Sequence, residues 1–239
     1  MKKTSLFKFI FLSFLLVAAP IDSQAQSSNT KSEQKIKYKK ARALQSSTAK
    51  RMAKVYEALE RIDEETGKED PDYDTAKEIL SELRNNSENL KSYDRSVLWN
   101  SWGYMYIIDE KIDLATDAYT KLINEPEVTL GLRNAGLLTL AQLYMASEEF
   151  EKSIDLLLEW MSQVEKVTAQ SWSILATAYY QLGDFEKALE NMEKAITLAE
   201  DEGYKPKENW YIVVVASVEE LKNKIGPKNA MLRQVDIYE

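Results

Sequence analysis

The chain has no cysteine and no histidine among its 239 residues. It therefore cannot form a disulfide, a Cys–His nucleophile pair, a Ser-His-Asp triad, or a zinc site built from imidazole and thiolate ligands. Glycine and proline are also few, at seven and five, and no phosphate-binding pattern of the GxxxxGK[ST] or GxGxxG type occurs. The composition excludes most of the common catalytic and nucleotide-binding arrangements.

Acidic side chains are the one catalytic type present in quantity, with 39 Asp and Glu residues. They cluster at Glu64–Glu65, Glu148–Glu149 and Glu200–Glu202, so a two-carboxylate enzyme acting on cell-wall glycan is the enzymatic alternative. These clusters fall at predicted turns and helix ends, where acidic residues are common. They also lack the DxDxDG spacing of a calcium loop. We predict no catalytic residue, no metal site and no cofactor.

The first 25 residues have the pattern of a secretory signal. Three lysines occur within the first eight residues, an apolar run covers residues 9–19, and a cleavage-like triplet of small and polar residues follows at 23–25. The apolar run is shorter than the roughly 20 residues that a membrane span needs. We therefore predict cleavage after Ala25 and a soluble, periplasmic product.

The charge of the chain is unevenly distributed. The net charge is −8. Residues 1–25 carry +2, and residues 26–61 carry +7 from ten Lys and Arg against three Glu, so residues 62–239 carry −17. Residues 26–45 are predicted to be a disordered basic leader. An acidic body argues against nucleic acid as a partner, because binding phosphates needs a basic face. The basic arm at residues 31–54 is either a solvated tether or a peripheral contact to anionic lipid or an acidic protein.

Three segments of the chain can be overlaid on one another. They start at residues 96, 134 and 169, and the spacings of 38 and 35 are close to the 34 residues of a tetratricopeptide repeat (TPR). Each has a small residue in its first helix (helix A) and another in its second (helix B), which would let the two helices approach closely. These small residues pair as Gly103 with Ala115, Ala141 with Ser153, and Ala176 with Ala188.

The repeats define the predicted domain organisation. We expect an all-α, TPR-type right-handed helical solenoid of about four helix-turn-helix repeats, because one helix pair cannot bury its own apolar face. An end without a polar capping helix also predicts that further chain follows or that this end docks on another molecule. The predicted units are a degenerate first repeat at 46–95, repeats at 96–129, 134–167 and 169–202, and an incomplete repeat at 207–239 whose helix B starts at Asn229.

The outward positions of the four A helices predict a protein-binding groove. It is neutral and aromatic, and it lacks the Lys, Arg and Asn cluster with which some TPR domains hold a partner's C-terminal carboxylate. An amphipathic helix or an extended apolar peptide suits such a surface; the alternative is that further helices cover it. The predicted groove residues are Asn100, Tyr104, Ile107, Leu138, Gln142, Met145, Ser173, Thr177, Tyr180 and Tyr211, with Val215 and Val218 completing the last helix.

Several strings go beyond the general repeat pattern. They are residues 54–59, 92–104, 138–144 and 207–210, and in this order and spacing they resemble exported TPR proteins described as components of TonB energy-transduction systems. The resemblance covers roughly residues 50–239 and matches the N-terminal half of longer family members. It implies a periplasmic scaffold with TonB, ExbB or ExbD as partner, and it brings no catalytic residue with it.

A second protein-binding function remains open. A general envelope chaperone, or an adaptor of outer-membrane assembly, would use the same apolar groove to bind many unfolded peptides weakly. The two hypotheses differ in selectivity, because a TonB accessory would bind one partner and a chaperone would bind many.

Overall fold

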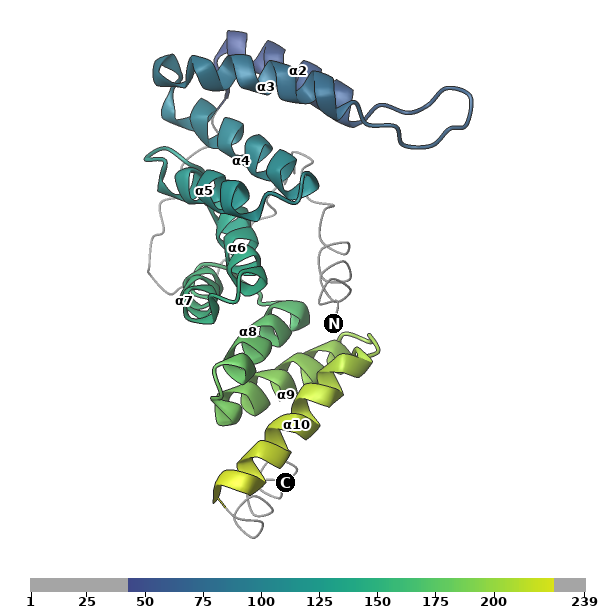
Figure 1. Ribbon diagram of the computed structural model, residues 1–239, viewed down its shortest axis with the longest axis vertical. Coiled ribbons are helices and arrows are strands. Elements are labelled where there is room, and N and C mark those ends of the chain that lie inside the picture. The colour runs from purple at the N-terminus through teal and green to yellow at the C-terminus, as the bar shows by residue number, and fades with distance from the viewer. Residues whose placement is uncertain (1–42, 226–239) are drawn as a thin grey trace, which may run out of the picture. The chain divides into compact units, whose positions relative to one another are not determined.

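The computed structural model describes residues 43–225, all within one compact unit, Lys39–Glu239. These residues form nine α-helices and one short 3-10 helix (Figure 1). The predicted signal peptide, the leader up to residue 42 and the helix predicted from Asn229 lie outside the described residues. The helices are α2 Ser46–Leu59, α3 Tyr73–Asn85, η1 Ser87–Asn89, α4 Ser92–Ile108, α5 Ile112–Asn124, α6 Leu130–Ala146, α7 Phe150–Met161, α8 Ala169–Gln181, α9 Phe185–Asp201 and α10 Glu208–Ile225.

The helices pack in the order in which they occur along the chain. The contacts are closest within the pairs α4–α5, α6–α7 and α8–α9, and each pair also packs against the next. The pair α2–α3 precedes them, and α10 packs on α9. Helices of this kind have one apolar face each, so stacking on neighbours is what buries a continuous core. Within residues 43–225, no helix is both long and apolar enough to cross a membrane.

Small residues allow close approach of helices within each pair, as predicted. Ala141 and Ala176 on the A helices and Ala115 and Ala188 on the B helices have no exposed surface. At Gly103 an added Cβ would lie only 2.5 Å from the ring of Tyr119 on α5. A side chain at this position would therefore displace the ring, which explains why glycine occurs in the middle of a helix despite its low helix propensity.

Lysines of the B helices cover the aromatic residues of the A helices. Lys121 lies 5.0 Å from the ring centre of Trp99, and Lys194 lies 5.0 Å from that of Trp172. Two tyrosines have the same kind of cover, with Lys152 over Tyr144 and Lys187 over Tyr179. These contacts place the four aromatic rings on the side of helix A that faces helix B.

Three turns between A and B helices share one backbone motif. The turn residue has a left-handed conformation at Glu110 (φ 58°), Glu148 (φ 61°) and Gly183 (φ 76°). The next N–H in each turn then donates to a tyrosine carbonyl five residues back, closing the helix as a Schellman motif does. These bonds are Lys111 to Tyr106 (2.8 Å), Glu149 to Tyr144 (2.9 Å) and Asp184 to Tyr179 (3.0 Å).

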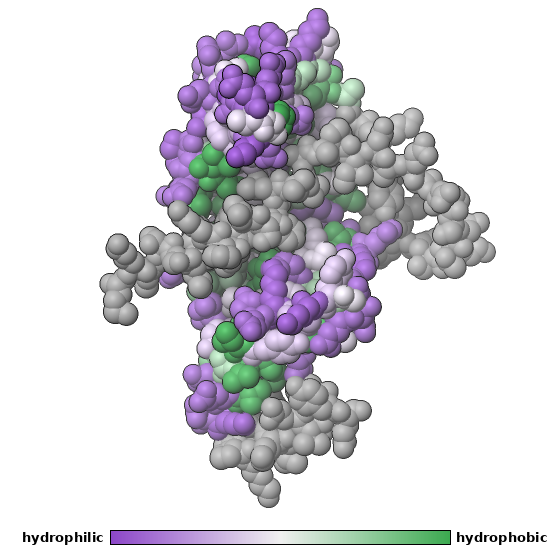
Figure 2. Space-filling model, turned by 90° about the vertical axis from the view of Figure 1, so that its right-hand side faces the viewer, coloured by the Kyte–Doolittle hydropathy of each residue, from purple (hydrophilic) through white to green (hydrophobic). Residues whose placement is uncertain are grey.

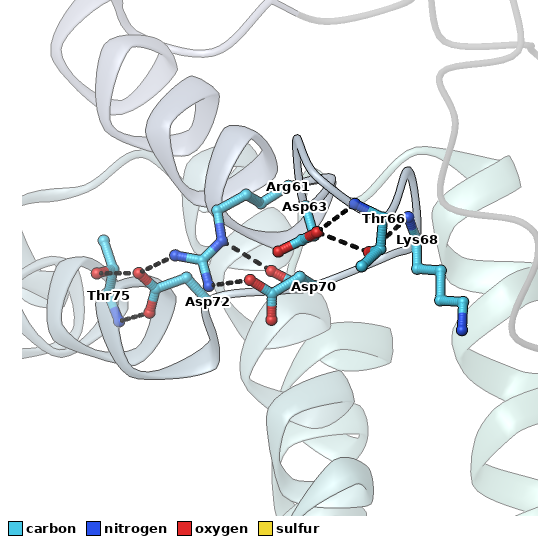
Figure 3. A network of polar contacts seen from close by, with 7 residues as sticks. All are labelled: Arg61, Asp63, Thr66, Lys68, Asp70, Asp72 and Thr75. Atoms are coloured by element: carbon cyan, nitrogen blue, oxygen red, sulfur yellow. Dashed lines mark hydrogen bonds and ion pairs between the residues drawn. The ribbon is translucent and has the colours of Figure 1, made fainter.

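The connection between α2 and α3 is longer and differently ordered. It folds back on itself as a hairpin with a single antiparallel bridge between Ile62 and Glu69. Arg61 lies between two aspartates (Figure 3), donating to the carbonyl of Asp70 at 2.8 Å, to its carboxylate at 2.7 Å, and to the carboxylate of Asp72 at 3.2 Å. Side-chain hydrogen bonds therefore stabilise this loop, whereas the three short turns rely on a backbone motif.

One sequence prediction in this region is wrong. Ile62 falls at helical spacing after Leu59, so the spacing alone predicts that the helix continues until Gly67 interrupts it. Helix α2 instead ends at Leu59, and Ile62 is 50% exposed in the hairpin. The backbone N–H groups that would have continued the helix are used across the hairpin, where Asp63 N–H donates to the carbonyl of Lys68 at 2.9 Å.

Candidate protein-binding surface

All ten predicted groove residues lie on the A helices of the repeats, α4, α6, α8 and α10. Their exposure differs from what the sequence suggested. Tyr211 on α10 is exposed and Ser173 on α8 is buried. The other eight are half-buried: Asn100, Tyr104, Ile107, Leu138, Gln142, Met145, Thr177 and Tyr180.

The half-buried residues are held by packing against neighbouring elements. Tyr104 packs on the buried cluster that includes Leu98. Burial raises the pKa of its hydroxyl, and the nearby Tyr73 makes a smaller contribution in the same direction. Leu138 and Met145 pack on a second cluster formed by α6, α7 and α8. The ring of Tyr180 meets that of Phe185 edge-on, with ring centres 5.4 Å apart. These side chains therefore present a fixed surface of limited area.

Two hydroxyls of α8 are turned onto their own helix. Ser173 is only 3% exposed, and its Oγ donates to the carbonyl of Gln170 at 2.8 Å. The Oγ1 of Thr177 donates to the carbonyl of Ser173, also at 2.8 Å. Hydroxyls bonded in this way are not free donors for a partner. Val218 on α10 is likewise 8% exposed and packs with Leu189, so Ser173 and Val218 do not belong to the accessible surface.

The surface formed by α4, α6 and α8 is almost free of charge. Helix α8 carries no charged residue at all, and the charges of α4 and α6 are confined to the first four residues of each helix. Arg95 donates to both carboxylate oxygens of Glu125, at 2.7 and 2.9 Å, and these bonds raise the pKa of its guanidinium. Arg133 donates to Glu159 at 2.6 Å. The two arginines therefore tie their helices to the B helix that follows and leave the outward face neutral.

Helix α10 exposes the largest apolar area of this surface. Tyr211 is 43% exposed, Ile212 66% and Val215 64%. The hydroxyl of Tyr211 donates to Glu200 on α9 at 3.3 Å, which orients the ring. Hydrophobic surface lies beside hydrophilic surface at the height of α10 (Figure 2).

The repeat register does not place Ile212 among the groove positions. It falls inside the unbroken apolar run 212–216, where every face of the helix carries an aliphatic residue. In such a run the period of the pattern does not distinguish the buried face from the exposed one.

Other kinds of site find little support among the described residues. The acidic clusters Glu64–Glu65, Glu148–Glu149 and Glu200–Glu202 lie on three separate connections or helix ends. Residues 43–225 contain no group of three or more acidic side chains placed to hold a metal ion. A cavity of about 470 Å³ lies between α2 and α3, where the Arg51–Glu82 ion pair (2.8 Å) and the buried Thr48 contribute to its wall.

Comparison with known proteins supports the fold. The family model of the tetratricopeptide repeat matches residues 133–201, which hold most of α6 and all of α7, α8 and α9. No curated protein matches the sequence.

Several solved structures are similar in fold. The apo form of RapI has a TM-score of 0.56 at 14% identity, covering 78% of this chain and 67% of that chain. MamA (41-end) from Desulfovibrio magneticus RS-1 has a TM-score of 0.53 at 14% identity, covering 82% and 96%. A protein of nearly identical TPR-like repeats from Podospora anserina has a TM-score of 0.51 at 18% identity, covering 80% and 93%. The predicted fold, an all-α solenoid of TPR type, is therefore confirmed.

Proposed function

We propose that this protein is a non-enzymatic scaffold that binds another protein along the outward face of its A helices. The observations that carry the proposal are the neutral surface of α4, α6 and α8 and the exposed apolar side chains of α10. A surface of this kind gains from losing water when an apolar helix or strand covers it. It offers no strong charge for a nucleic acid and no clustered acid–base pair for a reaction.

The fold supports the same proposal. Stacked helix pairs present one extended face to a ligand, and repeat proteins use such faces for binding. The packing of the half-buried residues also fixes their side chains before a partner arrives, which lowers the entropy that binding costs.

The finer part of the proposal is a periplasmic role as an accessory of TonB-dependent energy transduction and nutrient uptake. It rests on the secretory pattern of residues 1–25 and on the resemblance of the strings between residues 54 and 210. A partner of the TonB, ExbB or ExbD type would bind the A-helix face. Contact of the basic arm with the membrane would be peripheral at most.

Site-specific photocrosslinking in living cells tests the surface. A probe is placed in turn at Tyr104, Gln142 and Tyr180, which lie on three different A helices. Matched probes at exposed positions of the B helices serve as controls: Asp113 on α5, Asp155 on α7 and Thr197 on α9. We expect adducts from the first set only, identified by mass spectrometry. Equal labelling from both sets, or none from the A helices, contradicts the proposed surface.

The identity of the adducts tests the role. Crosslinks to TonB, ExbB or ExbD support the accessory function, whereas adducts with many unrelated envelope proteins support the chaperone or assembly adaptor. Deletion of the gene should impair TonB-dependent growth on chelated iron. If growth is unchanged and no TonB-system protein co-purifies, the TonB role is wrong, although the binding surface can still stand.

A further inference from the structure

The exposed face of α10 carries two apolar side chains between two acidic ones. Ile212 and Val215 are each about two-thirds exposed, at 66% and 64%. Glu208 precedes them by about one turn and Glu219 follows by about one turn, and both glutamates are exposed. Residues three or four apart lie on the same side of a helix. The face therefore places two carboxylates at the two ends of an apolar stripe.

This acidic frame is particular to α10. In the register of the repeats, the positions of Glu208 and Glu219 are occupied on the other A helices by uncharged residues. The residues equivalent to Glu208 are Val97, Ala135 and Gln170, and those equivalent to Glu219 are Ile108, Ala146 and Gln181.

Lysines near this face offset part of the acidic charge of the frame, and Lys205 is exposed three residues before Glu208. The ammonium of Lys207 donates to Gln170 at 2.6 Å, which directs it toward α8. Lys222 follows Glu219 by three residues on the same side of the helix and is half-buried, so it offsets part of the negative charge of Glu219. Glu200 adds a third carboxylate beside Tyr211 and accepts a hydrogen bond from its hydroxyl.

We propose that the exposed face of α10 docks an apolar peptide segment flanked by lysine or arginine. This inference rests on the proposed protein-binding function and adds the chemistry of the partner. The aliphatic side chains of Ile212 and Val215 provide the buried contact. Glu208 and Glu219 select basic flanking residues and repel acidic ones, because complementary charge at the rim sets specificity and association rate.

Two short fluorescent peptides test the proposal by anisotropy with the purified protein. Both have the same leucine-rich centre; one is flanked by lysines and the other by glutamates. At low salt we expect the lysine-flanked peptide to bind about fivefold to tenfold more tightly, which corresponds to two exposed charge contacts. The preference should shrink at high salt, because exposed charges are screened. Equal affinity of the two peptides overturns the inference and leaves the proposed function intact.

A pair of neighbouring substitutions separates local from general charge effects. Glu219→Lys changes the acidic frame, whereas Glu220→Lys makes the same charge change one residue along, on a different side of the exposed helix. We expect Glu219→Lys to reduce the preference about threefold and Glu220→Lys to leave it close to that of the wild type. If both variants lose the preference equally, the attraction comes from the net charge of the protein and the inference is wrong.

The apolar part of the face has its own test. Val215→Ser should weaken both peptides alike and leave the lysine preference unchanged. If neither peptide binds while crosslinking at Gln142 still captures a partner, the inference is overturned and the proposed function stands. If the protein dimerises without peptide and Val215→Ser restores the monomer, a second copy of the chain occupies this face and the inference is likewise overturned.

Discussion

The helix pairs α2–α3 and α8–α9 reach a similar arrangement through different connections. Between α8 and α9 a single left-handed residue, Gly183, turns the chain, and the N–H of Asp184 closes the end of α8. Between α2 and α3 the chain forms a hairpin that Arg61 holds through Asp70 and Asp72. The conformation of the short turn depends on the backbone of one residue. The conformation of the long connection depends on solvent-exposed side-chain hydrogen bonds to aspartates, which protonation at acidic pH weakens.

Replacing a buried alanine between two helices by a large residue should lower the free energy of unfolding most, and it should do so in both helix pairs. Ala188 in α9 and Ala76 in α3 have no exposed surface. We expect Ala188→Trp and Ala76→Trp each to lower the free energy of unfolding by about 3 kcal/mol or to prevent folding, through overpacking. Urea denaturation measures the change, and Thr197→Trp at an exposed position of α9 is the control. A large effect in α9 alone would mean that the two pairs differ in packing as well as in their turns.

The glycine of the short turn should have the next largest effect. A Cβ at Gly183 would meet nothing closer than the Phe185 Cζ at 4.0 Å, so the cost of Gly183→Ala comes from the backbone. We expect a loss of about 1 kcal/mol in the free energy of unfolding.

The hairpin glycine provides the matched comparison for that prediction. Gly67 has a similar φ of 65° and nothing within 4 Å of an added Cβ. Gly67→Ala should change the global transition less than Gly183→Ala, because the hairpin can open while the helices stay folded. An equal loss at the two positions would show that the hairpin and the helices unfold as one unit.

The glutamates of the equivalent turns should respond in the opposite direction. Glu148 has a φ of 61°, which costs a residue with a Cβ more than it costs glycine. Glu148→Gly should therefore raise the free energy of unfolding, by about 0.5 kcal/mol after the larger chain entropy of the unfolded state is counted. Ser147→Gly is the control, because its φ of −88° gives glycine no advantage. A loss of stability in Glu148→Gly would show that the glutamate side chain contributes more than the strain costs.

The smallest global effect is expected from the hairpin, whose polar contacts are exposed. Hydrogen bonds from Thr66 lower the pKa of Asp63, and hydrogen bonds from Thr75 lower that of Asp72. Because their pKa values are lowered in the folded state, both carboxylates stabilise the loop at pH values above their ordinary pKa of 3.8. This contribution is lost as the pH falls through the folded-state pKa values.

Amide hydrogen exchange measures this acid sensitivity. Protection of the Asp63 and Asp70 N–H groups, which bond across the hairpin, should fall at acidic pH and in Arg61→Ala at neutral pH. The N–H of Ser147 at the end of α6, which donates to the carbonyl of Leu143, is the control, because its partner is a helix carbonyl. Loss of protection at all three amides together would show unfolding of the whole domain and would remove the contrast between the two kinds of connection.

Much of the repeat architecture could be predicted because its signals are local. Phe150 and Phe185 occupy the same offset in their repeats and are the first residues of α7 and α9. The small residues expected between helices are buried. Ile62 was misplaced because helical spacing alone does not show that the chain leaves the helix to pair across a hairpin.

The candidate surface was predicted less well. The residues predicted for it lie on the A helices, but Ser173 is buried, and the exposed Ile212 was not included. The general position of an outward face follows from the repeat register. The exposure of a single side chain on that face depends on the helix beside it.

The sequence by itself determined that this protein is an all-α solenoid of TPR type, and that its A helices carry almost no charge. These properties follow from the spacing and chemistry of residues close together along the chain. Only the tertiary structure decided that Tyr104 and Met145 are half-buried, while Val215 on α10 is exposed beside Glu219. The reason is physical: the accessible area of a side chain is what neighbouring helices leave uncovered, and those neighbours come from other parts of the chain.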